Sequence, residues 1–205
     1  MKVPEFPFND SEDVTAALQA VGELLEDEGA RISIVIIGGA ALQLTGAISR
    51  ATRDIDIVAL TETPGRLDEL VRPPAQLPDV LRRAILSVAE LRGLPDNWLN
   101  RGPANQWDYG LPPGFAARVQ WRSFAALDVG IASRVDLIHF KLEAAADQPT
   151  ADHRHFKDLL ALEPTPDELA AAAQWVKSVN VGAEYHDIID RVVAHATSRT
   201  AARRR

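Results

Sequence analysis

Segments with the pattern of β-strands occur only before Ser133, and every periodic segment after it has the spacing of a helix. Strands are predicted at 31–37, 54–60, 115–121 and 125–131, with helices at 14–27, 40–44 and 77–91. After Ser133, helices are predicted at 134–147, 151–162, 166–179 and 183–197. Strands followed by helices are typical of an α+β fold. We therefore expect a small mixed sheet within an α/β core over residues 1–132, and a helical half over residues 133–205.

Two of the later helices carry capping residues at their predicted starts. Ser133 and Asp136 have the spacing of a capping box. Thr165 is followed by proline at the first helical position and by Glu168 at the third, which is a stronger start signal.

One earlier segment is irregular. Residues 93–114 are rich in Pro, Gly, Asn and Trp, so we expect a long ordered loop or lid there.

The composition of the 205-residue chain excludes several classes of protein. Apolar residues make up 46% and charged residues 25%, which rules out intrinsic disorder and provides a core. The chain has no cysteine, so disulfides, thiolate metal sites and a cysteine nucleophile are excluded. A formal net charge of -7 has the wrong sign for a protein that coats nucleic acid without specificity. A polyanion would therefore have to be bound by a local basic patch.

The hydropathy pattern contains no candidate membrane segment. The longest apolar run, residues 34–44, is interrupted by Gly38 and Gly39 and is too short to cross a bilayer. The residues after Lys2 include Pro4, Glu5 and Pro7 instead of an apolar stretch, so no secretory signal is visible. With the absence of cysteine, these features lead us to expect a cytoplasmic protein with no membrane partner.

The segment from Gly38 to Asp56 has the most informative chemistry. Two glycines between a buried strand and a helix let the backbone approach a ligand closely and leave N–H groups for an anion. Asp54 and Asp56 are two residues apart at the start of an apolar strand, so both carboxylates face the same side. Two such carboxylates repel unless a cation or a proton lies between them, and hard oxygen ligands suit Mg²⁺. A phosphate cradle beside a Mg²⁺ site is what phosphoryl or nucleotidyl transfer requires.

Each feature alone also has an ordinary structural interpretation. Gly38 and Gly39 are typical of a tight turn, and an Asp-x-Asp pair is typical of a solvated strand end. A charged pair that opens a buried apolar strand is less ordinary, because it needs compensation. The dinucleotide-binding and P-loop glycine fingerprints are both absent from the sequence, which argues against those two classes of protein.

The glycine pair, Gly46, Arg50, Thr52 and the two aspartates together resemble the signature of the DNA polymerase β-type nucleotidyltransferase superfamily. Within it, the segment is similar to the branch of the AbiEii and MenT-like toxins of bacterial toxin–antitoxin pairs, which includes domains of unknown function. The resemblance is strongest over residues 34–58. It implies that Asp54 and Asp56 are catalytic and bind the metal, and that the two glycines bind the nucleotide.

The resemblance extends more weakly to two motifs in the helical half. The segment 133–145 matches the lysine motif of the branch, and Lys141 is the only Lys or Arg between residues 135 and 148. Asp158 falls at the acidic motif, where the second acid of the family is replaced by Ala161. The resemblance implies that Lys141 lies against the triphosphate and that Asp158 orients Lys141 or a hydroxyl nucleophile.

Other interpretations of these two residues remain open at the level of the sequence. Lys141 has the spacing of a solvated helix lysine that pairs with Glu143 or Asp147. Asp158 has the spacing of a surface acid that pairs with Lys157 or Arg154. Both alternatives need only local contacts.

Three further residues between the glycines and the aspartates are candidates for nucleotide binding. Thr52 contacts the triphosphate or orients Asp54 in the functional interpretation, although a β-branched residue before a strand needs no such role. Arg50 and Arg53 flank the aspartates and are candidates for binding phosphate or an acceptor nucleic acid. The superfamily also has a third carboxylate, for which Asp128 is our first candidate and Asp108 the second.

The resemblance implies a Mg²⁺-dependent enzyme that transfers an NMP from an NTP to an RNA, with a tRNA acceptor end as the expected target. Arg50, Arg53, Arg154, Lys157 and the Arg203–Arg205 tail are the basic residues available to hold the RNA. A cognate antitoxin protein is a further expected partner. Two alternatives use the same fold: a non-catalytic protein that binds a nucleotide or a partner, and a nucleotidyltransferase that modifies a small molecule.

Overall fold

The computed structural model describes residues 7–61, 63, 69–148, 150, 153–180 and 182–203. The chain divides into two compact units, 1–132 and 133–205, and each is described by itself. The first holds strands and helices, and in its described part the second is helical, which confirms the predicted α+β fold. None of the described helices combines the length and apolar character that crossing a membrane requires.

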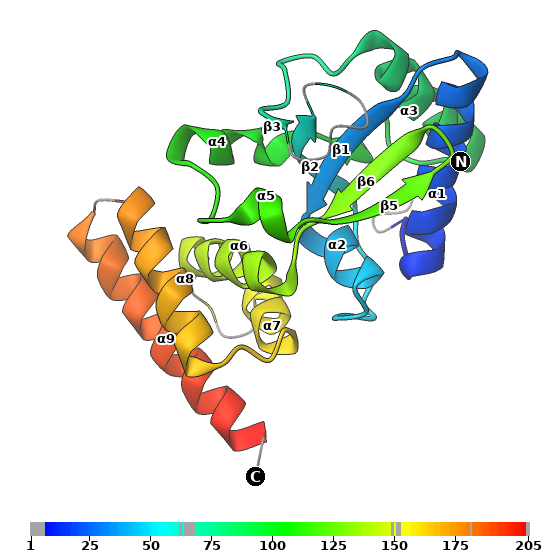
Figure 1. The fold of residues 1–205 in the computed structure, drawn as a ribbon. Helices are drawn as coiled ribbons and strands as arrows, with labels where there is room; N and C mark the ends of the chain where they lie inside the picture. The colour runs from blue at the N-terminus through cyan, green and yellow to red at the C-terminus, as the bar shows by residue number, and fades with distance from the viewer. Residues whose placement is uncertain are drawn as a thin grey trace. The chain divides into compact units, whose positions relative to one another are not determined.

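The first unit is built on a six-stranded mixed sheet in the described residues (Figure 1). Its strands are β1 (Ile32–Ile37), β2 (Ile55–Thr61), β3 (Leu70–Val71), β4 (Leu99–Asn100), β5 (Gln120–Phe124) and β6 (Leu127–Ile131). The order is β3-β2-β1-β6-β5, and β4 pairs with the first part of β2. All six residues of β1 are buried, because the strand lies in the middle of the sheet. β1 runs antiparallel to β2 and parallel to β6.

Helical segments lie between and beside these strands along the first unit. They are α1 (Ser11–Asp27), α2 (Gly38–Leu44), α3 (Asp79–Arg92), η1 (Gly102–Asn105), α4 (Gln106–Tyr109) and α5 (Phe115–Arg118). α1 begins at the Asp10 N-cap and ends before Gly29, whose φ of 65° is the left-handed conformation typical of a residue that ends a helix. α1 and α3 pack against each other through the apolar faces that their sequence periods predict.

The predicted strand over 115–121 is wrong in its first half. Gly114 has a φ of 73°, and the N–H of Phe115 donates to the carbonyl of Pro112 at 3.0 Å, so the chain enters a helical turn. The turn, α5, buries Phe115 in the core. β5 therefore starts later than predicted, at Gln120, and forms an exposed edge of the sheet. The predicted loop 93–114 also contains β4, η1 and α4, whose short lengths leave no periodic signal.

The second unit consists, in its described residues, of α6 (Arg134–Asp147), α7 (Arg154–Ala161), α8 (Pro166–Val179) and α9 (Ala183–Arg203). Both predicted caps are confirmed. The Ser133 hydroxyl accepts a hydrogen bond from the N–H of Asp136 at 3.2 Å. Thr165 and Glu168 form a reciprocal capping box, in which the Glu168 carboxylate accepts from the Thr165 N–H at 2.8 Å.

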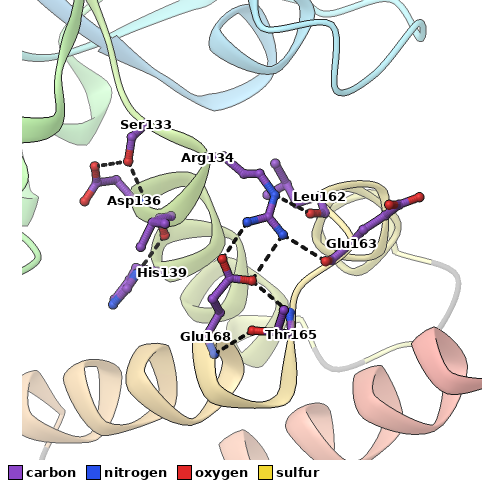
Figure 2. Close-up of polar contacts among 9 residues, drawn as sticks. Ser133, Arg134, Asp136, His139, Leu162, Glu163, Thr165 and Glu168 are labelled. Carbon is purple, nitrogen blue, oxygen red and sulfur yellow. Dashed lines mark hydrogen bonds and ion pairs between the residues drawn. The ribbon is translucent and has the colours of Figure 1, made fainter.

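Arg134 joins the start of α6 to the connection between α7 and α8 (Figure 2). Its guanidinium donates to the carbonyl oxygens of Leu162 and Glu163, both at 2.8 Å, and to the Glu168 carboxylate at 2.5 Å. The hydrogen bond from Arg134 holds the pKa of Glu168 below its usual value. This exposed ion pair fixes the loop that places α7, and α7 carries Asp158.

Candidate functional site

The glycine pair lies at the junction of β1 and α2, where the backbone turns sharply. Gly38 has a φ of 78°, a conformation that residues with a side chain rarely adopt. A Cβ on Gly38 would lie 2.5 Å from the Asp56 carboxylate, and one on Gly39 would overlap the hydroxyl of Thr52. Gly38 therefore requires glycine, and a side chain on Gly39 would displace that of Thr52. The sequence-predicted residues Gly38, Gly39, Thr52 and Asp56 come together at one place in the first unit.

Asp56 is positioned by two neighbouring strands. It pairs with Ile37 of β1 and with Asn100 of β4, so its side chain shares a sheet face with that of Asn100. The Asn100 amide oxygen accepts a hydrogen bond from the N–H of Gly102 at 2.6 Å. A Cβ on Gly102 would lie 4.0 Å from the second carboxylate oxygen of Asp56. Residues without side chains thus lie beside both oxygens of this carboxylate.

Asn100 and Gly102 were missed by reasoning from the sequence. They lie in the segment that we predicted as a loop or lid, and β4 is only two residues long. A polar residue two positions before a Gly-Pro pair is a turn signal, but it does not reveal which strand the turn adjoins. The register of β4 against β2 is a long-range feature that the local pattern does not contain.

Asp54 lies one residue before β2 and two residues from Asp56. Both aspartates are half-buried, and Ile55 between them is fully buried. The N–H of Ile55 donates to the carbonyl of Trp98 at 2.6 Å, which holds this end of β2 against the segment before β4. The alternation that buries Ile55 leaves both carboxylates partly accessible, as an Asp-x-Asp pair at a strand end requires.

Thr52 is buried, whereas the two arginines around it reach solvent. Thr52 exchanges backbone hydrogen bonds with Phe8, at 2.8 and 3.3 Å, and this bridge holds its hydroxyl against Gly39. Arg50 is half-buried and donates to the carbonyl of Ala51 at 2.9 Å. Arg53 is exposed. Arg50 and Arg53 flank Thr52 in the chain, and the position of Arg53 leaves it accessible to a ligand.

Neither candidate for a third carboxylate shares the environment of Asp56. Asp128 pairs with Ser33 on β1, four residues before Ile37, which is about 13 Å along the strand. Its carboxylate accepts from the Arg31 guanidinium at 2.7 and 2.9 Å and from the Ser123 hydroxyl at 2.8 Å.

Asp108, the second candidate, is half exposed on α4 and forms an ion pair with Arg72. In the described residues, no group of three or more His, Asp or Glu side chains could hold a metal ion. Any cation at Asp56 would therefore rely on the two aspartates and on oxygen atoms from a ligand.

Lys141 and Asp158 form a buried ion pair within the second unit. The Lys141 ammonium on α6 donates to the Asp158 carboxylate on α7 at 2.7 Å, and the side chains are 6% and 2% exposed. Because both side chains are buried, neither residue is the solvated surface residue that the alternative interpretations describe. Asp147 accepts from the hydroxyl of Tyr185 at 2.7 Å. Burial, followed by the hydrogen bond to Asp147, raises the pKa of Tyr185.

His155 lies one turn before Asp158 on α7 and is held in its neutral form. Burial, followed by the charges of Lys141 and Arg154, lowers the pKa of His155 from 6.5 to about 4. Its ring lies against that of His153, with 4.9 Å between the ring centroids. The neighbourhood of the buried ion pair therefore disfavours an additional positive charge.

The comparison with known protein families identifies the class to which the chain belongs. The chain belongs to the family DUF6036, described as a nucleotidyltransferase of unknown function, whose model matches residues 13–156. The match spans the glycine pair, both aspartates and Lys141, and it ends two residues before Asp158. No curated protein and no solved structure matches the chain. The toxin branch named by the sequence resemblance stays a prediction.

Proposed function

We propose that this protein is a Mg²⁺-dependent nucleotidyltransferase that moves an NMP from an NTP to an acceptor and releases pyrophosphate. The observation that carries the proposal is the close approach of Gly38 to the Asp56 carboxylate, in a chain of a nucleotidyltransferase family. A side chain at Gly38 would fill the space beside one oxygen of Asp56. Its absence leaves room for a cation and a phosphate group at that carboxylate.

The residues around Asp56 fit a magnesium ion. Asp54 and Asp56 offer hard carboxylate oxygens and are half-buried. Mg²⁺ typically binds one or two carboxylates and completes its shell with water and substrate phosphates, so two aspartates suffice. The bound ion would supply positive charge that offsets the negative charge of the triphosphate. The backbone N–H groups of Gly38 and Gly39 and the hydroxyl of Thr52 would hold phosphate oxygens in our proposal.

Lys141 and Asp158 enter the proposal through the family resemblance. Asp158 accepts a hydrogen bond from the Lys141 ammonium, so it holds that lysine in one orientation. A lysine held in this way would neutralise negative charge on the transferring phosphate, which is an electrostatic contribution to catalysis. Asp158 would then be a positioning residue, because it acts through Lys141.

We further propose that the acceptor is the end of an RNA, such as a tRNA, and that the protein acts in the cytoplasm as the toxin of a toxin–antitoxin pair. Support comes from the sequence resemblance and from the exposed Arg53, which suits a phosphate contact. Arg154 and Lys157 are exposed on α7 and offer further contacts. Of the tail predicted to assist, Arg204 and Arg205 lie outside the described residues. With a net charge of -7, RNA binding would depend on a few phosphates.

The direct test is to incubate the purified protein with Mg²⁺, total RNA and each labelled NTP in turn. We expect label on RNA with the wild type and none with Asp54→Asn. Asp27→Asn is the matched control, since Asp27 is an exposed acid at the end of α1. Label on a small molecule or on protein would replace RNA as the acceptor. Nucleotide binding without any transfer would favour the non-catalytic alternative.

The toxin role has its own test in living cells. We expect expression of the wild type to stop growth of a bacterial host, and expression of Asp54→Asn to leave growth unchanged. Co-expression of the gene next to this one should restore growth if it encodes the antitoxin. Normal growth despite transfer activity in vitro would retain the enzyme and remove the toxin role.

A further inference from the structure

A cavity of about 560 Å³ lies beside β4 in the first unit. Its walls come from the segment 75–77, from α3 and from the segment 96–101. This volume is within the range of pockets that bind small molecules. None of the roles assigned above to Asp54, Asp56 or the glycine pair uses this cavity.

The cavity adjoins the candidate metal site through Asn100. Asn100 lines the cavity and is also the β4 partner of Asp56 on β2. Neighbouring strands are about 4.8 Å apart, so the cavity wall includes a residue one strand away from Asp56. A ligand that extends from Asp56 across β4 would reach this cavity.

Arg101 lines the cavity, and its guanidinium has one buried donor without a partner in the described residues. The Nε atom of Arg101 is buried, and in the described part of the chain it has no hydrogen-bond partner. One terminal nitrogen of the same side chain donates to the carbonyl of Pro73 at 3.4 Å. A buried guanidinium N–H without an acceptor is unfavourable, and an anionic ligand in the cavity would pair with the charge of the same guanidinium. Arg82 provides a second guanidinium on the wall.

The remaining lining suits a nucleoside. Its apolar part is formed by Leu77, Ile85, Leu86 and Leu99. An apolar wall of this kind covers the face of a base, and the side-chain amides of Gln76 and Asn97 can pair with its edge. The carboxylate of Asp96 also lines the cavity and can accept hydrogen bonds from ribose hydroxyl groups.

We propose that this cavity is a nucleotide subsite, in which Arg101 binds the phosphate and the apolar wall covers the base. The proposal rests on the proposed function, because it places the subsite one strand away from the transferring centre. Two sources share this chemistry: the donor NTP and the terminal nucleotide of the acceptor RNA. Kinetic measurements with each substrate distinguish them.

The test uses the indole N–H of Trp98 as a reporter in the full chain. This group donates to the carbonyl of Ile85 at 3.0 Å, directly behind the cavity wall. We expect its NMR signal to shift when a nucleoside monophosphate or a trinucleotide RNA is added without metal. The indole signal of Trp175, in the second unit, serves as the control. Absence of a Trp98 shift with every nucleotide would overturn the proposal.

Two variants test the lining. Arg101→Gln should raise the dissociation constant of the nucleotide by about tenfold, as expected for the loss of a charge-assisted hydrogen bond. Leu86→Glu should weaken binding similarly, because Leu86 is 39% exposed and a carboxylate there repels phosphate. Arg83→Gln is the matched control, since Arg83 pairs with Glu28 on α1. Unchanged binding in both lining variants would contradict the proposal.

The kinetic measurement separates this proposal from the proposed function. If the wild type transfers label, a higher KM for the NTP in Arg101→Gln assigns the subsite to the donor. A higher KM for the RNA assigns it to the acceptor. Transfer with both KM values unchanged removes the subsite and leaves the enzyme. Nucleotide binding at Trp98 without any transfer by the wild type removes the enzyme and leaves the subsite.

Discussion

In the first unit, Asp54 and Asp56 stay half-buried at the start of β2, whereas in the second unit Lys141 and Asp158 are almost completely withdrawn from solvent. The aspartates have the same sign of charge and lie two residues apart in the chain. The lysine and its acid have opposite charges and come from two helices. The first unit therefore keeps two like charges in contact with solvent, whereas the second unit pairs a buried charge with an opposite one.

This difference predicts how stability and activity are divided between the two regions. Partly exposed carboxylates are hydrated in the folded chain, so replacing one should change stability little. A buried ion pair has lost its hydration, and removing one partner leaves the other charge poorly compensated. Substitutions at the aspartates of the first unit should therefore lower activity without lowering stability. Substitutions at the buried pair of the second unit should lower both.

The largest effect is expected from Asp54→Asn. An amide keeps the shape of the side chain but removes the charge that would bind Mg²⁺, so NMP transfer should fall by about a thousandfold or more. The free energy of unfolding should stay within about 0.5 kcal/mol of the wild type, because Asp54 is partly exposed. Radiolabel transfer and urea denaturation measure the two quantities. A clear loss of stability with activity retained would make Asp54 a structural residue.

Replacing one residue of the buried Lys141–Asp158 pair should, in contrast, lower the free energy of unfolding strongly. Lys141→Met removes the cation that the Asp158 carboxylate contacts at 2.7 Å, and should lower the free energy of unfolding by about 3–5 kcal/mol. The double variant with Asp158→Leu should recover at least half of that loss, because both charges are then gone.

Transfer assays on the same variants sharpen the comparison. If Lys141 acts in catalysis, the double variant should regain stability without regaining activity, and Lys141→Arg should restore activity only in part, since a guanidinium has a different shape. Recovery of both stability and activity in the double variant would show that the pair has a structural role alone.

Much of the fold was predictable because its signals are local. The period of α6 and α8, and the caps at Ser133 and Thr165, lie within a few neighbouring residues, so these helices begin as predicted. The strand at 115–121 was wrong because the turn at Gly114 favours a helical start that the apolar pattern does not reveal. β3 and β4, with two residues each, are too short for a periodic signal.

The candidate site was likewise predictable where its signals are local, and not where it depends on strand register. Gly38 and Asp56 come together because β1 and β2 are adjacent antiparallel strands, and the sequence supplied both segments. Asn100 was missed because it reaches Asp56 through the register of β4. Asp128 lies on β6, which neighbours β1 and not β2, and its pairing with Ser33 places it towards the opposite end of β1. Which residue Lys141 contacts was decided by helix packing, which local spacing does not determine.

Glycine substitutions measure how closely the first unit encloses the Asp56 carboxylate. Gly38 and Gly46 have similar φ values, 78° and 74°, so alanine should cost each about 1–2 kcal/mol of backbone strain. At Gly38 the added Cβ also lies 2.5 Å from the Asp56 carboxylate, whereas nothing lies within 4 Å of one at Gly46. Thermal unfolding should therefore show a further loss of about 1–3 kcal/mol for Gly38→Ala alone.

The same pair of variants reports on function. Gly38→Ala should abolish transfer because its Cβ occupies space beside the Asp56 carboxylate, while Gly46→Ala should keep transfer at temperatures where it stays folded. Equal stability losses in the two variants would mean that Asp56 moves aside without cost. Equal activities would mean that the space beside Asp56 is not used by the substrate.

The smallest effect is the pH dependence that His155 gives to the second unit. Burial, followed by the charges of Lys141, Arg154 and His153, lowers its pKa to about 4, while Asp158 acts in the opposite direction. Between pH 6.5 and about 4, the unfolded chain takes up a proton at this ring that the folded chain does not. The free energy of unfolding should therefore fall as the pH is lowered through this window, and the contribution should level off below it.

We expect this contribution to amount to about 1–2 kcal/mol, less than the full pKa difference implies, because solvent reaches part of the ring and screens its neighbours. The measurement compares urea denaturation of the wild type and His155→Gln at several pH values from 8 to 4, with the His155 ring followed by NMR. The difference between the two curves should be flat above pH 7 and grow towards pH 4. A His155 ring that titrates near pH 6.5 in the folded chain would show that the Lys141–Asp158 region is open to water, and the contrast between the two units would then be smaller than their exposures indicate.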